Sequence, residues 1–130
     1  MKRKAAALIS VFLLLLSLAG CGGYSSSYRA TLLVRSETPD SSYMSFYTLD
    51  GRMVFRMKSA EGQRLRYEAE LEDGSLTVYY DCGGGKEELC RLRGGEARND
   101  ETEPLGKGTV YIILETSGKC SGGKFTFEID

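Results

Sequence analysis

The chain has 130 residues, of which 17 are basic and 18 acidic, and it contains four cysteines but neither histidine nor tryptophan. The lack of histidine removes the usual general base near neutral pH and every Ser–His or Cys–His nucleophile pair. The balance of charges argues against a nucleic-acid-binding protein, which would need a basic surface.

The first 20 residues have the pattern of a secretory signal peptide. Lys2, Arg3 and Lys4 precede a run of 14 residues (5–18) that is apolar except at Ser10 and Ser17. A basic start, a short apolar run and a boundary of small residues are typical of such peptides. At about 1.5 Å per residue the run is shorter than the hydrocarbon core of about 30 Å, so we expect a signal-peptide helix and not a permanent span.

The boundary Leu18-Ala19-Gly20-Cys21 resembles the lipobox of bacterial lipoproteins at every position. In that family a diacylglyceryl group is attached to the cysteine thiol, and a signal peptidase cuts just before it. The resemblance therefore implies that a lipidated Cys21 begins the mature chain and holds it to the extracytoplasmic face of the cell membrane. The alternative is a plain signal peptide. In the lipoprotein interpretation, residues 21–27 are the lipidated cysteine and a flexible glycine- and serine-rich tether.

The 109 residues after Cys21 are enough for one domain, predicted over 28–130. Three basic and no acidic residues precede Cys21, so this mature part has a net charge of −4. A mildly acidic domain with mixed charges argues against peripheral binding to anionic lipid. We therefore expect the lipid on Cys21 to supply the membrane attachment.

From Tyr28 onward apolar residues alternate with polar ones, which is the pattern of half-buried β-strands. Asp50-Gly51 predicts a hairpin turn between two such strands, and the polar stretch 94–104 predicts a solvated loop. Together these features predict an all-β, jelly-roll-like antiparallel β-sandwich of seven or eight strands. The strands are expected at 29–34, 43–49, 52–58, 64–71, 75–82, 88–92, 109–116 and 124–129. The expected core residues are Leu65, Tyr67, Leu76, Val78, Ile112, Phe125, Phe127 and Ile129.

Residues 47–129 loosely resemble small jelly-roll domains of secreted bacterial proteins, of the pre-peptidase C-terminal and GOLD-like types. The shared outline consists of four strand motifs, at Phe55–Gly62, Gly74–Asp81, Gly108–Ile112 and Gly123–Ile129. The resemblance implies a non-catalytic domain that serves binding, solubility or secretion, without a cofactor. The aspartates of the pre-peptidase pattern are not clearly matched here.

Three cysteines, Cys82, Cys90 and Cys120, remain in the exported domain, so at most one intramolecular disulfide can form. A short link from Cys82 to Cys90 is conceivable, but a bond from either to Cys120 closes a longer loop and would stabilise more. If a bond forms, we therefore expect it to include Cys120. The alternative is that all three are reduced, buried side chains. A metal site built on them would lack a fourth ligand, so no metal is predicted.

Other polar residues give weaker indications of a site. Four tyrosines, Tyr43, Tyr47, Tyr79 and Tyr111, could line a ligand-binding face, although packing is the default role of strand tyrosines. The acidic residues Asp100, Glu101 and Glu103 lack calcium-loop spacing, which favours a solvated loop. Catalysis without histidine would require Ser45 beside a lysine, or a pair such as Asp81 and Glu87 in a deep cleft.

We therefore predict a lipid-anchored, non-catalytic binding or accessory module of the cell envelope. Its partners would be the membrane, through Cys21, and an envelope protein or glycan. The alternative is a carbohydrate- or peptide-binding domain that uses exposed tyrosines, and a histidine-free hydrolase is the third hypothesis.

Overall fold

The computed structural model describes residues 23–130, which form nine β-strands and contain no helix that could span a membrane. The all-β prediction is confirmed, with nine strands instead of seven or eight. The predicted signal peptide and Cys21 lie outside the described residues. The strands are β1 (Ser27–Thr31), β2 (Val34–Glu37), β3 (Ser41–Ser59), β4 (Leu65–Asp73), β5 (Ser75–Asp81), β6 (Glu87–Arg93), β7 (Glu96–Glu101), β8 (Gly108–Thr116) and β9 (Cys120–Ile129).

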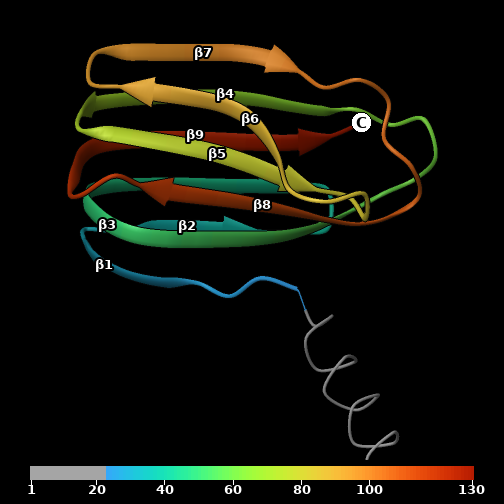
Figure 1. Cartoon of the computed structure of the whole chain (residues 1–130), viewed down its shortest axis with the longest axis horizontal. Coiled ribbons are helices and arrows are strands. Elements are labelled where there is room, and N and C mark those ends of the chain that lie inside the picture. The colour runs from blue at the N-terminus through green and yellow to red at the C-terminus, as the bar shows by residue number, and fades with distance from the viewer. Residues whose placement is uncertain (1–22) are drawn as a thin grey trace, which may run out of the picture.

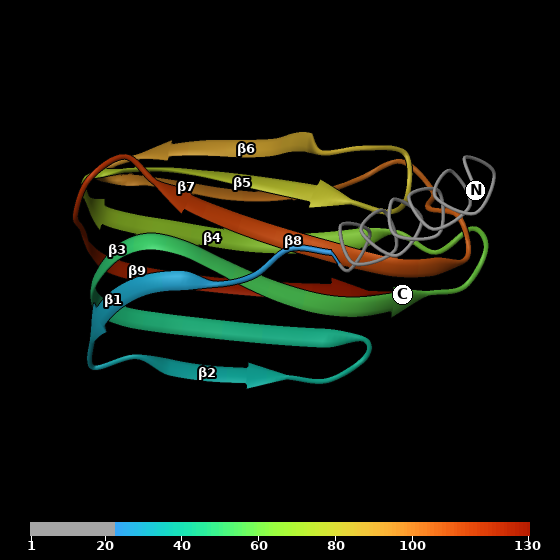
Figure 2. The same cartoon turned by 60° about the horizontal axis from the view of Figure 1, so that its bottom comes forward.

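All strand pairs are antiparallel, in the order β6-β5-β8-β3-β9-β4-β7, with β1 and β2 also paired to β3. The long strand β3 belongs to both layers of a sandwich (Figures 1 and 2). Its first half pairs with β2 and β9, and with β4 and β7 it forms what we call the β4 sheet. Its second half pairs with β8, and with β5 and β6 it forms the β5 sheet.

The prediction of a hairpin at Asp50-Gly51 is wrong, although the chain does reverse direction there (Figure 2). The two halves of β3 pair with different strands, and β1 runs along the bend from Ser27 beside Arg52 to Thr31 beside Thr48. Gly51 has φ 127°, and a Cβ there would lie 2.3 Å from the carbonyl oxygen of Ser27. Each half has one apolar face, and placing the halves in opposite sheets buries both faces against each other.

The core lies between the two sheets and contains all eight predicted core residues, each at most 6% exposed. Phe55 of the β5 sheet contacts Phe127 of the β4 sheet, with ring centroids 6.1 Å apart. At the open side, the Tyr67 hydroxyl of β4 donates a hydrogen bond to the Leu89 carbonyl oxygen of β6. Burial of such large apolar side chains contributes about 1.5–3 kcal/mol each to folding.

The stretch predicted as a solvated loop contains a strand, because β7 (Glu96–Glu101) pairs along β4. Its side chains are almost all exposed, so no alternation of apolar residues marks it in the sequence. β7 is the edge strand of the β4 sheet. Charged side chains on an edge strand hinder its pairing with strands of other chains. After it, the Thr102 hydroxyl oxygen accepts a hydrogen bond from the Leu65 amide, 3.1 Å away.

Candidate functional site

The four tyrosines proposed as one ligand face lie on two different sheets. Tyr43 and Tyr47 are on the outer face of the β4 sheet, whereas Tyr79 of β5 and Tyr111 of β8 are on the outer face of the β5 sheet. The bend in β3 causes this separation, since it places strands that are close in sequence in opposite layers.

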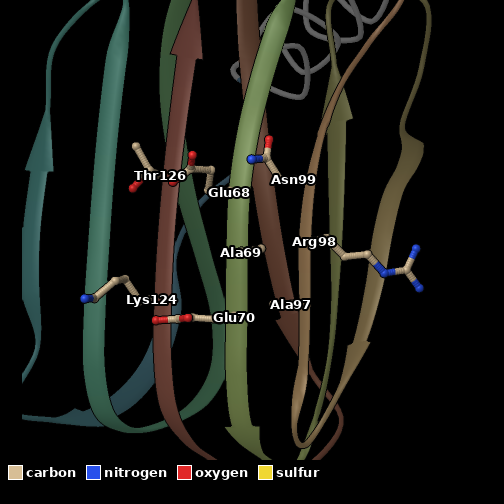
Figure 3. A pocket seen from close by; sticks show the side chains of 8 residues that line it. All are labelled: Glu68, Ala69, Glu70, Ala97, Arg98, Asn99, Lys124 and Thr126. Atoms are coloured by element: carbon tan, nitrogen blue, oxygen red, sulfur yellow. The ribbon is translucent and has the colours of Figure 1, made fainter.

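The outer face of the β4 sheet presents polar side chains in rows that cross the strands. One row runs from Tyr43 through Thr126 and Glu68 to Asn99. The next runs from Ser45 through Lys124 and Glu70 to Ala97. Parts of both rows line an open hollow of about 390 Å³, in which Arg98 points away from the other side chains (Figure 3). Sequence reasoning named Tyr43, Tyr47, Ser45 and Glu101 of this face but not the side chains that line the hollow, because alternating polar residues are the normal sign of any solvated strand face.

The side chains that line this hollow have free polar groups. Among residues 23–130, Glu68, Glu70, Asn99, Lys124 and Thr126 take part in no side-chain hydrogen bond and no ion pair. One row away the pattern differs, because Arg66 contacts Glu101 at 3.3 Å and Asp130 at 3.1 Å. The hollow therefore offers carboxylate, amide, ammonium and hydroxyl groups that are free to bind a ligand.

The same face is acidic and has an apolar border. Six acidic side chains outnumber the three basic ones on it; the acidic ones are Glu68, Glu70, Glu72, Glu101, Glu128 and Asp130, and the basic ones are Arg64, Arg66 and Lys124. Where β2 pairs with β3, Leu32 before β2 is 81% exposed, Val34 of β2 is 55% exposed and Tyr47 of β3 is 64% exposed. Leu32 also has φ 49°, a left-handed conformation that is unfavourable for a leucine. Exposed aliphatic side chains next to charged rows are typical of a protein-binding surface.

On the opposite side of the molecule, the segment before β1 is held against the outer face of the β5 sheet. The Tyr24 hydroxyl donates a hydrogen bond of 2.6 Å to Asp81, and its ring packs edge-on against Tyr111, with centroids 5.5 Å apart. Ser26 accepts the amide of Val54 through its hydroxyl oxygen. Residues 24–27, predicted to be part of a flexible tether, therefore contact the domain, and Ser27 already belongs to β1.

Asp81 is the polar centre of this contact. One carboxylate oxygen accepts the Tyr24 hydroxyl, and the other accepts the amides of Gly83 at 2.8 Å and Gly85 at 3.3 Å. These hydrogen bonds, the one from Tyr24 first, lower the pKa of Asp81 below its usual value of 3.8. The same bond, together with burial, raises the pKa of Tyr24 above 10.0. Both groups are thus held in the charge states that form the bond at neutral pH.

The residues considered for catalysis do not come together. Ser45 lies on the open face of the β4 sheet, opposite Lys124, without an enclosing cleft. Asp81 is engaged by Tyr24, whereas Glu87 accepts a hydrogen bond of 2.9 Å from the Tyr80 hydroxyl. Glu87 is paired with Tyr80 on the neighbouring strand and points to the same side as Tyr80. Asp81 follows Tyr80 in β5 and points to the opposite side, so Asp81 and Glu87 do not form a carboxylate pair. Burial, with the Glu87 bond, raises the pKa of Tyr80 to about 12.

Cys82, Cys90 and Cys120 are free in the structure, and the expectation that a bond, if one forms, includes Cys120 stays a prediction. Cys120 begins β9, where it lies beside Leu49 and close to the start of β5, whereas Cys82 follows the end of β5. Cys90 is paired with Val78, four residues from Cys82, and a bulge follows this pair between Val78 and Tyr79. Four strand residues span about 13 Å, well beyond the 7 Å limit for a disulfide. Burial raises the pKa of Cys90 to about 11.

The acidic residues considered for calcium lie on or just after β7. Glu101 forms an ion pair with Arg64 at 3.2 Å through one carboxylate oxygen and with Arg66 through the other. Within the described part of the chain, no group of three histidine, cysteine, aspartate or glutamate residues is arranged to hold a metal ion.

Comparison with known proteins yields similarities of structure only. No protein-family model matches the sequence, and no curated protein sequence is significantly similar to it. Among solved structures, the periplasmic g-type lysozyme inhibitor PliG of Aeromonas hydrophila has 10% identity and a TM-score of 0.51, with 71% of this chain and 88% of that chain covered.

Two further solved structures are similar in outline. The pre-peptidase C-terminal domain of a Bacillus anthracis collagenase has 13% identity and a TM-score of 0.45, with 78% of this chain and 98% of that chain covered. The carbohydrate-binding module TmCBM61, solved with β-1,4-galactotriose, has 18% identity and a TM-score of 0.45, with 75% and 69% covered. The similarity to PliG shows that the chain shares its all-β fold.

Proposed function

We propose that this protein is a lipid-anchored, non-catalytic binding module of the bacterial cell envelope, and that it binds a protein partner with a basic surface. The lipid is carried by Cys21, and the binding surface is the outer face of the β4 sheet. The observation that carries the proposal is the acidic face itself, where Glu68 and Glu70 border the hollow without a partner among the described residues.

The charge of this face favours a cationic partner. Its acidic side chains outnumber the basic ones six to three, and complementary charge increases the rate of association and selects among partners. The exposed Leu32, Val34 and Tyr47 supply apolar contact beside it. A buried apolar contact with a charged rim is the usual anatomy of a protein interface. A glycan would stack on the tyrosines and form hydrogen bonds with the hydroxyls, but two exposed aliphatic side chains offer it no comparable contact.

Two observations support placing this module outside the cytoplasm. The lipobox Leu18-Ala19-Gly20-Cys21 follows a basic start and an apolar run, as in exported lipoproteins. The fold is shared with PliG, which is a periplasmic inhibitor of a lysozyme and therefore acts on another protein. Both support the proposal, and the following two experiments test it.

The lipid anchor is tested by metabolic labelling with a palmitate analogue in cells that express the full chain. The wild type should be labelled and recovered with membranes, and Cys21→Ala should lose both properties. A Cys82→Ala variant controls for labelling of the half-exposed thiol and should remain labelled. Equal labelling of wild type and Cys21→Ala would contradict the proposal.

The binding surface is tested with a basic protein as the probe, and a g-type lysozyme is the first choice. Affinity for the immobilised mature protein should fall steeply with salt, and the double variant Glu68→Lys, Glu70→Lys should abolish binding. The double variant Glu88→Lys, Glu103→Lys changes the net charge equally but away from this face, and it should retain most of the affinity. Binding to neutral oligosaccharides, unaffected by salt or by Glu68→Lys, would instead support the carbohydrate-binding alternative.

A further inference from the structure

We propose that the outer face of the β5 sheet lies against the membrane surface, so that the acidic face of the β4 sheet points away from it. This inference rests on the lipid at Cys21 in the proposed function. It adds a fixed orientation of the domain, which the presence of an anchor does not by itself require. Two independent features of the described residues carry it: where the N-terminal segment leaves the domain, and where the basic side chains lie.

The N-terminal segment leaves the domain on the outer face of the β5 sheet. Gly23 lies so close to Tyr111 that a Cβ would be 2.4 Å from the phenol oxygen, and its φ is 88°. Only two residue steps separate Gly23 from Cys21. At no more than about 3.6 Å per residue, the lipid is attached within about 7 Å of this point. The domain is therefore held close to the bilayer and not on a long stalk.

The contacts of Tyr24 and Ser26 fix the direction of this segment. Tyr24 bonds Asp81 at the end of β5 and packs on Tyr111 of β8, so it crosses the face of the sheet. Ser26 accepts the amide of Val54, and Ser27 then pairs with Arg52. Arg56 closes the cluster, because its guanidinium donates a hydrogen bond of 3.3 Å to the Tyr111 hydroxyl. A segment bound at Tyr24, Ser26 and Ser27 cannot swivel freely about the anchor.

The charge of the face agrees with this orientation. Six basic side chains lie on the outer face of the β5 sheet or directly over it, against three acidic ones; the basic residues are Arg52, Arg56, Lys58, Lys86, Arg91 and Arg93, and the acidic ones are Asp81, Glu88 and Glu115. The opposite face has six acidic and three basic side chains. The net charge of the mature chain is −4 and hides this asymmetry, since it averages over both faces.

The short reach of the anchor makes these charges effective. Electrostatic attraction to anionic headgroups falls off over a Debye length of about 8–10 Å at physiological salt. The attachment point lies within about 7 Å of Gly23, so the basic face is held inside that distance. The acidic face would be repelled by the same headgroups if the domain turned it toward the bilayer. Both effects turn the same face toward the bilayer.

The orientation can be measured with a matched pair of spin labels. Thr109→Cys and Thr126→Cys replace half-buried threonines on the outer faces of the β5 and β4 sheets, in the central strands β8 and β9. Both are made in the full chain with Cys82→Ala, since Cys90 and Cys120 are buried. The lipidated proteins are placed in vesicles of phosphatidylcholine with a minor fraction of phosphatidylglycerol. Label relaxation is then recorded with a headgroup-chelated nickel lipid and with a water-soluble nickel complex.

We expect the label at position 109 to respond several-fold more to the headgroup-bound nickel than the label at position 126, with the order reversed for the soluble complex. Arg91→Gln with Arg93→Gln should reduce the difference, as should vesicles without phosphatidylglycerol. Equal responses at the two positions would overturn the orientation. The mass of the N-terminal peptide is measured on the same samples: a lipid adduct with equal responses refutes the orientation alone, and a missing adduct refutes the anchor and the orientation together.

Discussion

The hydroxyl of Tyr24 donates a 2.6 Å hydrogen bond to the carboxylate of Asp81, which lies 57 residues later in the chain. The other oxygen of that carboxylate is occupied by the amides of Gly83 and Gly85. One aspartate therefore fixes both the segment before the first strand and the glycine turn after β5. The bond couples the place where the chain enters the domain to the outer face of the β5 sheet.

Replacing Tyr24 by phenylalanine should raise the pKa of Asp81. The Tyr24 hydroxyl is the largest cause that lowers this pKa, and the lowered pKa means that the contact stabilises the fold above the unfolded value near 3.9 and is lost as pH falls through the folded value. Carboxyl carbon chemical shifts, followed by NMR during an acid titration, measure the change. Tyr28→Phe is the control and should leave the Asp81 titration unchanged. An unaltered titration in Tyr24→Phe would contradict the assigned hydrogen bond.

The fold class and core could be predicted because alternation records which residues face inward. Phe125, Phe127 and Ile129 follow one another at period two and are all buried, as expected. The bend at Asp50-Gly51 could not be predicted, since local sequence signals a turn without saying whether its arms pair with each other. The bend appears in the burial pattern of β3: the inward residues before it are even-numbered, such as Met44 and Phe46, and those after it are odd-numbered, such as Met53 and Phe55.

The candidate site was predictable only in part, for a related reason. The half-buried Tyr43 and the exposed Tyr47 stand out as aromatic residues, but Glu68, Lys124 and Asn99 resemble any other solvated strand residues. Their position in neighbouring rows depends on the pairing of β9 with β4 and of β4 with β7, and these strands are distant in sequence. The charge difference between the two faces is likewise a product of strand order. Composition reports only its average.

Ser42→Ala should leave the stability unchanged or raise it by up to about 1 kcal/mol. Ser42 is 1% exposed, and its hydroxyl has no hydrogen-bond partner among the described residues, so the folded state bears the cost of desolvating it. Thr102→Ala is the contrasting variant, because the buried amide of Leu65 would lose its hydrogen-bond acceptor. The free energy of unfolding should therefore fall by about 1–3 kcal/mol. Urea unfolding of both variants measures the difference. A loss above 1 kcal/mol for Ser42→Ala would show that its hydroxyl has a partner.

The three thiols of the domain should differ in reactivity. In the Cys21→Ala chain at pH 8, Cys82 should react first with a maleimide, because it is half-exposed, while Cys90 and Cys120 are buried. With the pKa of Cys90 raised to about 11, only about one thiol in a thousand is ionised at that pH. Mass spectrometry of quenched samples should show one fast modification, and three after denaturation. Modification of Cys90 at the rate of Cys82, or a disulfide in the unreduced protein, would contradict the structure.

Truncation of Phe127 to alanine should destabilise the domain by about 3–5 kcal/mol, a large share of the about 5–15 kcal/mol expected for a domain of this size. Phe127 is fully buried and its ring lies 6.1 Å from that of Phe55 across the sandwich, so the truncation would leave a cavity where the two sheets meet. The neighbouring Thr126→Ala is the matched control, since Thr126 points outward into the hollow and should cost less than about 1 kcal/mol. Both are measured by urea unfolding with a common m-value. If the two costs were equal, Phe127 would face water, and the register of β9 against β4 would be displaced by one residue.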